Sequence, residues 1–116
     1  MKLYIAVLDE FPDYMTPTLV AHAVLSYDRF AREDYRDQFR FDHNQYLKTS
    51  FKKVVVRVNQ KEFDKISALP DVYLGHENKT LEGRKSCAVW LDNGRDNLPN
   101  VLKYAKLWKP KEITNG

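Results

Sequence analysis

Titratable side chains stand at three places along this sequence where they are able to do acid–base chemistry. Asp9 begins the acidic loop "DEFPDYM", which follows an apolar run. His22 lies in "TPTLVAHAVLSY", and its imidazole, with an ordinary pKa of about 6.5, is suited to act as a base near neutral pH. Glu77 follows His76 in "DVYLGHE", and neighbours in an extended segment point to opposite faces, so these two do not form a pair. The candidate catalytic residues are therefore His22, Glu77 and Asp9.

Each of these residues also has a structural interpretation. Thr16 and Pro17 favour a helix that begins at Thr16, because proline is tolerated in a first turn. On that helix His22 stands between alanines, which favours close packing, and we expect its side chain to be mostly buried. Asp9 equally suits ordinary loop acidity near the positive end of a helix.

Cationic residues form a second candidate site, for nucleic acid. Arg32, Arg36 and Arg40 are spaced four apart and line one side of a helix. Acidic residues are interleaved with them, so the stripe is either a solvated face of ion pairs or a surface that contacts phosphates. The full basic set, with aromatic residues between its members, is Arg32, Arg36, Arg40, Lys48, Lys52, Lys53 and Arg84.

The elements that must position these residues are apolar strands alternating with amphipathic helices. Strands are predicted over 2–8, 52–58 and 86–91, with a short contribution near 71–75. The helical stretch 28–48 is expected to break near "RFDHN". This order predicts an α/β fold, a three-layer α/β/α sandwich with a mixed four-stranded sheet. Ligands then bind beyond the carboxyl ends of strands, which points to Asp9–Thr18, and also to His76–Arg84 if the strand at 71–77 shares that edge.

Length and composition fit one domain. The chain has 116 residues, of which 43% are hydrophobic and 30% charged, and a formal net charge of +3. We expect a single domain over 1–109 and a flexible polar tail over 110–116. Cys87, the one cysteine, is expected to be an inert core thiol, and no metal site or cofactor is predicted. No apolar run is long enough for a membrane span, and a cytoplasmic location is expected.

The order of these segments resembles the type II peptidyl-tRNA hydrolases over residues 2–108. The opening strand, acidic loop and helix carrying Ala21-His22-Ala23 resemble the start of that family. "FKKVVVRVNQKEFDKI" resembles its second strand and following helix, and "SCAVWLDNGRDNLPNVLKYAKLW" its closing strand, turn, helix and end strand. The likeness is specific in arrangement and weak in individual residues.

The resemblance implies hydrolysis of peptidyl- or aminoacyl-tRNA esters and tRNA or another RNA as partner. The family places a lysine and glycines before the first helix and a glutamine three residues before the histidine. Here "DYMTPT" holds neither lysine nor glycine, and Leu19 stands at the glutamine position. The alternative is therefore a catalytically degenerate RNA- or protein-binding module of the same fold, with a homodimer as one form. Any RNA contact is expected to run from the arginine stripe toward Lys48, Lys52 and Lys53.

Overall fold

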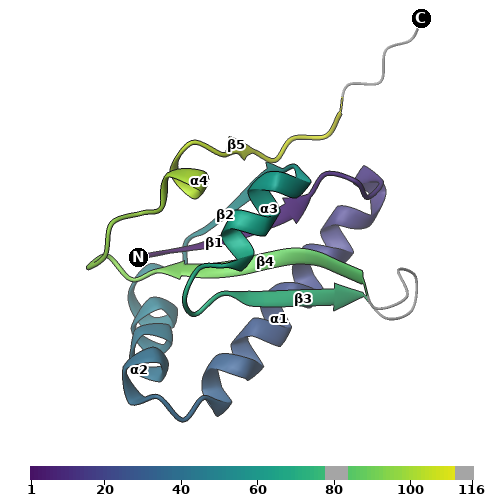
Figure 1. Ribbon diagram of the computed structural model, residues 1–116. Coiled ribbons are helices and arrows are strands. Elements are labelled where there is room, and N and C mark those ends of the chain that lie inside the picture. Colours follow the sequence, from purple (N-terminus) through teal and green to yellow (C-terminus); the bar gives the residue numbers. More distant parts are fainter. Residues whose placement is uncertain (78–83, 112–116) are drawn as a thin grey trace, which may run out of the picture.

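The computed structural model of the chain (Figure 1) describes residues 1–77 and 84–111. For His76, Glu77 and Arg84 it describes the backbone alone. The strands are β1 (Lys2–Leu8), β2 (Lys53–Val58), β3 (Tyr73–Glu77), β4 (Arg84–Asp92) and β5 (Lys106–Leu107). The helical segments are the 3-10 turn η1 (Asp13–Met15), α1 (Thr16–Glu33), α2 (Asp37–Gln45), the π-helical turn η2 (Tyr46–Ser50), α3 (Gln60–Ser67) and α4 (Asn100–Lys103).

The sheet is mixed and has five strands in the order β3-β4-β1-β2-β5. β1 and β2 pair in parallel, whereas the β1–β4, β3–β4 and β2–β5 pairs are antiparallel. The predicted mixed α/β class is confirmed, and all four predicted strands are present. The predicted strand count of four is wrong because β5 adds an edge strand of only two residues, too short to leave an alternating pattern in the sequence.

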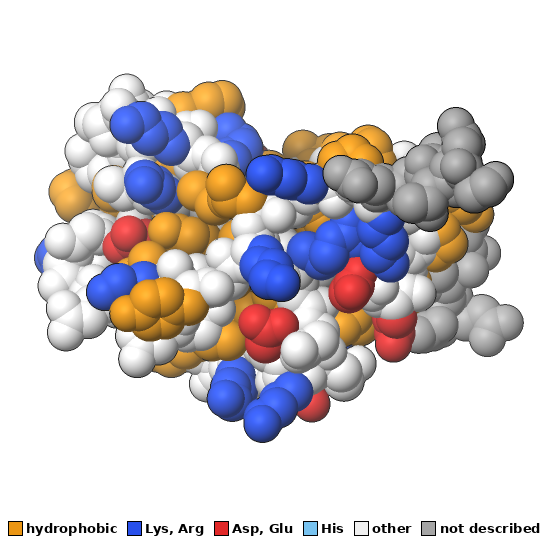
Figure 2. All heavy atoms as spheres, turned by 90° about the horizontal axis from the view of Figure 1, so that it is seen from above, with side chains coloured by type: hydrophobic (Ala, Val, Ile, Leu, Met, Phe, Trp, Pro, Cys, Tyr) orange, Lys and Arg blue, Asp and Glu red, His pale blue; other side chains and the backbone are white. Residues whose placement is uncertain are grey.

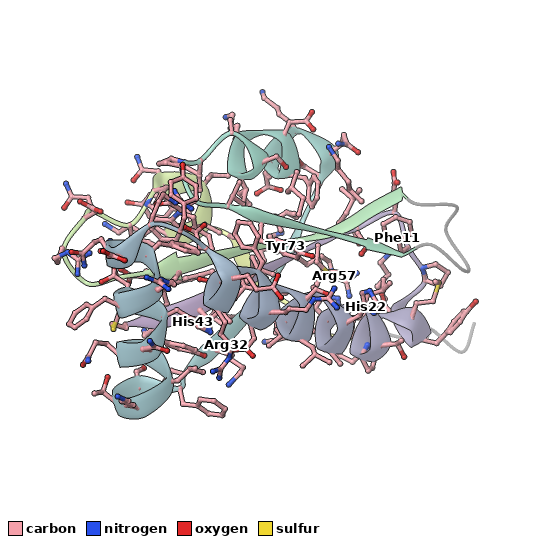
Figure 3. All side chains as sticks on the ribbon, turned by 90° about the horizontal axis from the view of Figure 1, so that it is seen from below. Phe11, His22, Arg32, His43, Arg57 and Tyr73 are labelled. Carbon is pink, nitrogen blue, oxygen red and sulfur yellow. The ribbon has the colours of Figure 1, made fainter. Side chains whose placement is uncertain are left out.

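Helices pack on both faces of this sheet, which explains why the central strand is wholly apolar. Residues 3–8 of β1 are all buried. α1 packs on β3 and β4, and it approaches so closely that a Cβ built on Gly75 would lie 3.1 Å from Cβ of Ala23. α3 packs on β1 and β2 from the opposite side, as Figure 3 shows. Cys87 is fully buried in β4, as predicted, and burial raises the pKa of its thiol to about 12.

The first helix begins at Thr16, as predicted, with Pro17 in its first turn. Met15 is the N-cap residue, and no side chain caps the helix. The predicted break near "RFDHN" is wrong, since the helix ends at Glu33 and α2 starts at Asp37. The cause is Asp34, whose carboxylate accepts a hydrogen bond from the backbone N–H of Arg36 at 2.7 Å and so competes with helical bonding.

No helix in the described ranges is both long and apolar enough to cross a membrane.

The cap of α3 gives the first testable prediction. Asn59 accepts from the N–H of Glu62 at 2.8 Å, and Glu62 accepts from the N–H of Asn59 at 3.0 Å. We expect Asn59→Ala to lower the free energy of unfolding by about 1 kcal/mol in urea denaturation, because a helix N-terminal donor loses its acceptor. Lys61→Ala, an exposed change in the same helix, serves as the control. Equal stabilities of the two variants would contradict the prediction.

Candidate functional site

His22 is exposed, so the prediction that it is buried is wrong. The buried residues of α1 are Thr16, Leu19, Ala23, Tyr27 and Ala31, which recur every three or four positions. His22 precedes Ala23 and therefore lies about 100° away from this stripe. It makes no hydrogen bond or ion pair within the described residues, and Figure 3 places it along α1, away from His43 and Arg32.

Asp9 is held in an ion cluster at the end of β1. Nη1 of Arg57 lies 2.7 Å from Asp9 and 3.0 Å from Asp13, and Nζ of Lys111 lies 3.3 Å from Asp9. The hydrogen bond from Arg57 is the main cause of a lowered pKa at Asp9. The guanidinium of Arg57 also lies 4.9 Å from the ring centre of Trp108. Asp9 is therefore a fixed, ionised ion-pair partner, and His22 is not among its contacts.

Two of the predicted site residues fall where side chains are not described. The backbones of Glu77 and Arg84 pair across β3 and β4. Their side chains, and residues 78–83 between them, lie outside the described part of the chain. Neither the role of Glu77 as acid or base nor that of Arg84 in nucleic-acid binding is tested here, and both stay predictions.

The prediction that the three arginines line one helix is wrong, since Arg32 lies in α1, Arg36 is the N-cap residue of α2 and Arg40 lies in α2. Acidic neighbours neutralise all three. The short contacts are Arg32 to Asp28 at 2.9 Å, Arg36 to Asp34 at 2.9 Å and also to Asp71, and Arg40 to Asp37 at 2.6 Å. Every arginine of the stripe thus has at least one carboxylate partner. This pairing favours the interpretation of the stripe as a solvated face of ion pairs over its interpretation as a surface that contacts phosphates.

The lysines of the predicted basic set differ from the arginines. Lys48, Lys52 and Lys53 are exposed, and none has a carboxylate partner among the described residues. Nζ of Lys53 donates to the carbonyl of Phe51 at 2.9 Å and lies 3.4 Å from the centre of its ring. Lys and Arg side chains also alternate with hydrophobic ones on the side of the molecule that carries β5 and α4 (Figure 2).

An apolar pocket lies beside these lysines, between α1, η2 and the starts of β1 and β2. We call it the α1–η2 pocket. Its volume is about 370 Å³. Its apolar walls include Leu3, Val24, Leu25, Leu47 and Phe51. A concave apolar site with a few convergent polar groups is the usual form of a binding site.

A histidine–aspartate pair forms the polar part of the α1–η2 pocket. Nε2 of His43 lies 2.7 Å from Oδ1 of Asp28, and Nε of Arg32 lies 2.9 Å from Oδ2. Burial raises the pKa of Asp28, but the hydrogen bonds from His43 and Arg32 outweigh it and hold the pKa below its usual range. The carboxylate is therefore ionised at neutral pH and only accepts, so Nε2 of His43 is the donor.

Two polar atoms beside this pair lack partners. Nδ1 of His43 and the hydroxyl of Tyr27 are buried with no hydrogen bond within the described ranges. His43 is 2% exposed and Tyr27 is fully buried, which raises the pKa of the Tyr27 phenol well above its usual value. Each of these buried polar atoms costs free energy while it has no hydrogen-bond partner.

Sequence reasoning missed His43. It lies fifteen residues from Asp28, and the break between α1 and α2 separates them, so no helical spacing relates the pair. The available signal was composition, since "RFDHNQY" places a histidine among aromatic residues on an amphipathic helix. That signal alone does not identify a partner.

No protein-family model and no curated protein matches this chain. Within the described residues, no group of three or more His, Cys, Asp or Glu side chains is arranged to hold a metal ion. Function is therefore inferred from the side chains and their surroundings.

The Asp28–His43 pair gives a prediction for stability. We expect Asp28→Ala to lower the free energy of unfolding by about 1–3 kcal/mol at pH 7, because it leaves the buried His43 N–H without an acceptor. The folded-state pKa of Asp28 is lowered, so its contribution is complete above the ordinary aspartate pKa of about 3.9 and is lost as the pH falls through the lower folded-state value.

The matched control is Asp64→Ala, which removes an exposed carboxylate on α3 whose one hydrogen-bond donor among the described residues is Gln60. Its effect should stay within about 0.5 kcal/mol. Denaturant unfolding at pH 7 and near pH 3 measures both variants. If Asp28→Ala and Asp64→Ala behave alike at pH 7, the buried pair does not contribute as described.

Proposed function

We propose that this chain is a single-stranded RNA-binding module with a degenerate peptidyl-tRNA hydrolase type II-like fold. The sequence patterns predict the order strand, helix, helix, strand, helix, strand, strand, helix, and the main elements follow it. Helices on both faces of the sheet are compatible with the three-layer α/β/α arrangement. The family assignment and the layer class are parts of this proposal.

The placement of the catalytic candidates favours binding over hydrolysis. Ester hydrolysis needs a base and oxyanion donors held close together. Asp9 is occupied by Arg57 and Lys111, whereas His22 stands alone on the surface of α1. The missing lysine before α1 and the leucine at position 19 remove further groups that the resemblance implies. Loss of one preorganised donor costs roughly 10²–10³ in rate.

The observation that carries the proposal is the group of cations without carboxylate partners around an exposed aromatic ring. Lys48, Lys52 and Lys53 surround Phe51 in sequence, and the Phe51 ring is 59% exposed. Cations that contact phosphates, next to an aromatic ring on which a base stacks, are the usual means of binding single strands.

Binding of a fluorescein-labelled single-stranded RNA dodecamer, followed by anisotropy at several salt concentrations, tests this proposal. We expect Lys48→Glu with Lys52→Glu to weaken binding, and the slope of log affinity against log salt to decrease by about 1.4 if two phosphate contacts are lost. Lys61→Glu with Lys65→Glu, on α3, makes the same change in net charge at exposed positions. Equal affinities and slopes for both double variants would refute the proposed surface.

A hydrolase is the second candidate, and the exposure of His22 is the observation that favours it. We expect the purified protein to hydrolyse peptidyl-tRNA no faster than a His22→Ala variant, because Asp9, the other candidate whose side chain is described, is held by Arg57 and Lys111 and does not contact His22. Release of peptide from labelled peptidyl-tRNA measures this, with Lys61→Ala as a surface control. Rapid hydrolysis that His22→Ala abolishes would replace the binding module with an enzyme.

A further inference from the structure

We propose that the α1–η2 pocket takes one unstacked base of a single-stranded RNA whose phosphates contact Lys48 and Lys52. This inference rests on the proposed function and names the group that the pocket recognises. It commits the pocket to a nucleobase instead of a protein side chain or a second copy of the chain.

The shape and polarity of the pocket suit a base. A nucleobase has two apolar faces and a polar edge with both donors and acceptors. Leu25, Leu47 and Phe51 supply apolar walls, and the volume of about 370 Å³ is in the range of small-molecule sites. Asp28 and Arg32 supply an acceptor and a donor at the same site, which a base edge complements.

The polar groups keep capacity for a ligand. Arg32 uses Nε for Asp28, and its terminal nitrogens make no hydrogen bond within the described residues. The Asp28 carboxylate has lone pairs beyond the two that His43 and Arg32 occupy. His43 and Tyr27 also line the pocket, although their atoms without partners, Nδ1 and the hydroxyl, are themselves buried.

The backbone at the pocket rim is strained in a way that presents an aromatic ring. Phe51 has a φ of 59°, in the left-handed region that bulky residues rarely adopt. It follows the π-helical turn η2, a form that is frequent at functional sites. Strain of this kind persists where surrounding contacts enforce it, and it clusters at ligand-binding sites. Here it holds the exposed Phe51 ring beside the apolar walls.

Lys53 connects the pocket with the proposed phosphate-binding surface. It lines the pocket, and its ammonium group lies over the Phe51 ring. Lys52 precedes it, and Lys48 belongs to η2 next to Leu47, a wall of the pocket. A strand that passes over these lysines therefore carries its bases past the opening of the pocket.

Phe51→Ala tests the inference in the intact chain, with the same dodecamer and salt series. Stacking on an aromatic ring is worth about 1–3 kcal/mol per base, so affinity should fall roughly 5- to 150-fold. The salt slope should not change, because no phosphate contact is removed. The control is Tyr104→Ala, another exposed aromatic ring with a lysine over it, Lys103 at 5.5 Å, which should bind as wild type does.

A second variant and a second ligand keep the test decisive if Phe51→Ala folds poorly. Ala21 is exposed and lines the pocket, so Ala21→Trp should fill it and reduce affinity to a similar degree. An abasic oligonucleotide of equal length should bind the wild type more weakly than the dodecamer does. Its affinity should be the same for the wild type and for both pocket variants. Amide shifts on α1 and η2 in NMR spectra with added RNA would support the assignment.

The outcomes separate the two proposals. If Ala21→Trp and Phe51→Ala bind RNA like wild type while the Lys48/Lys52 double variant does not, the base pocket is wrong and the proposed function stands. If wild type binds no single-stranded RNA at low salt, both fail. A wild-type dimer that Phe51→Ala converts to a monomer in sedimentation would assign the pocket to a second copy and overturn the inference.

Discussion

The arrangement of α1 and α2 depends on one hydrogen bond, in which Nε2 of His43 donates to the carboxylate of Asp28. His43 is almost completely buried, and an imidazole N–H in that position needs an acceptor. Asp28 supplies it from α1, which is itself fixed on the sheet by the close approach of Ala23 to Gly75. The bond therefore sets the position of α2 relative to the sheet. The α1–η2 pocket opens beside this pair, and both Asp28 and His43 line it.

The chain reversal from α2 into β2 explains why an aromatic ring stands at the rim. The Phe51 N–H donates to the carbonyl of Tyr46 at 2.9 Å, and the Tyr46 hydroxyl donates to the carbonyl of Lys52 at 2.9 Å. These bonds hold η2 wide and force Phe51 into the left-handed region. The parallel pairing of β1 with β2 then fixes the start of β2 beside Leu3. Phe51 is thus exposed because the helical segment η2 ends at Ser50 and β2 begins at Lys53, only a few residues later.

Sequence patterns predicted the elements well and the site poorly. The strand 2–8 was recognisable because apolar residues run without interruption, as a strand covered on both faces requires. His22 was misplaced because the alanines around it indicate close packing for the helix as a whole, whereas Ala23 alone faces the sheet at Gly75. The Asp28–His43 pair joins two helices across a break, and only tertiary packing brings such residues together. The edge strand β5 was left out of the predicted sheet, although the resemblance implies an end strand there, because two residues carry no periodicity of their own.

Pairing of charges, more than their number, decides which surface is available to a polyanion. Each arginine of the α1–α2 stripe lies close to a carboxylate, so phosphate would have to displace an existing partner and gains little. The lysines around Phe51 have no such competitor among the described residues. Lysine also keeps a compact, rotatable ammonium group that follows a mobile strand without demanding one geometry. A chain with a net charge of only +3 can therefore present a local cationic surface, because its acidic side chains form ion pairs with the arginines and leave these lysines unpaired among the described residues.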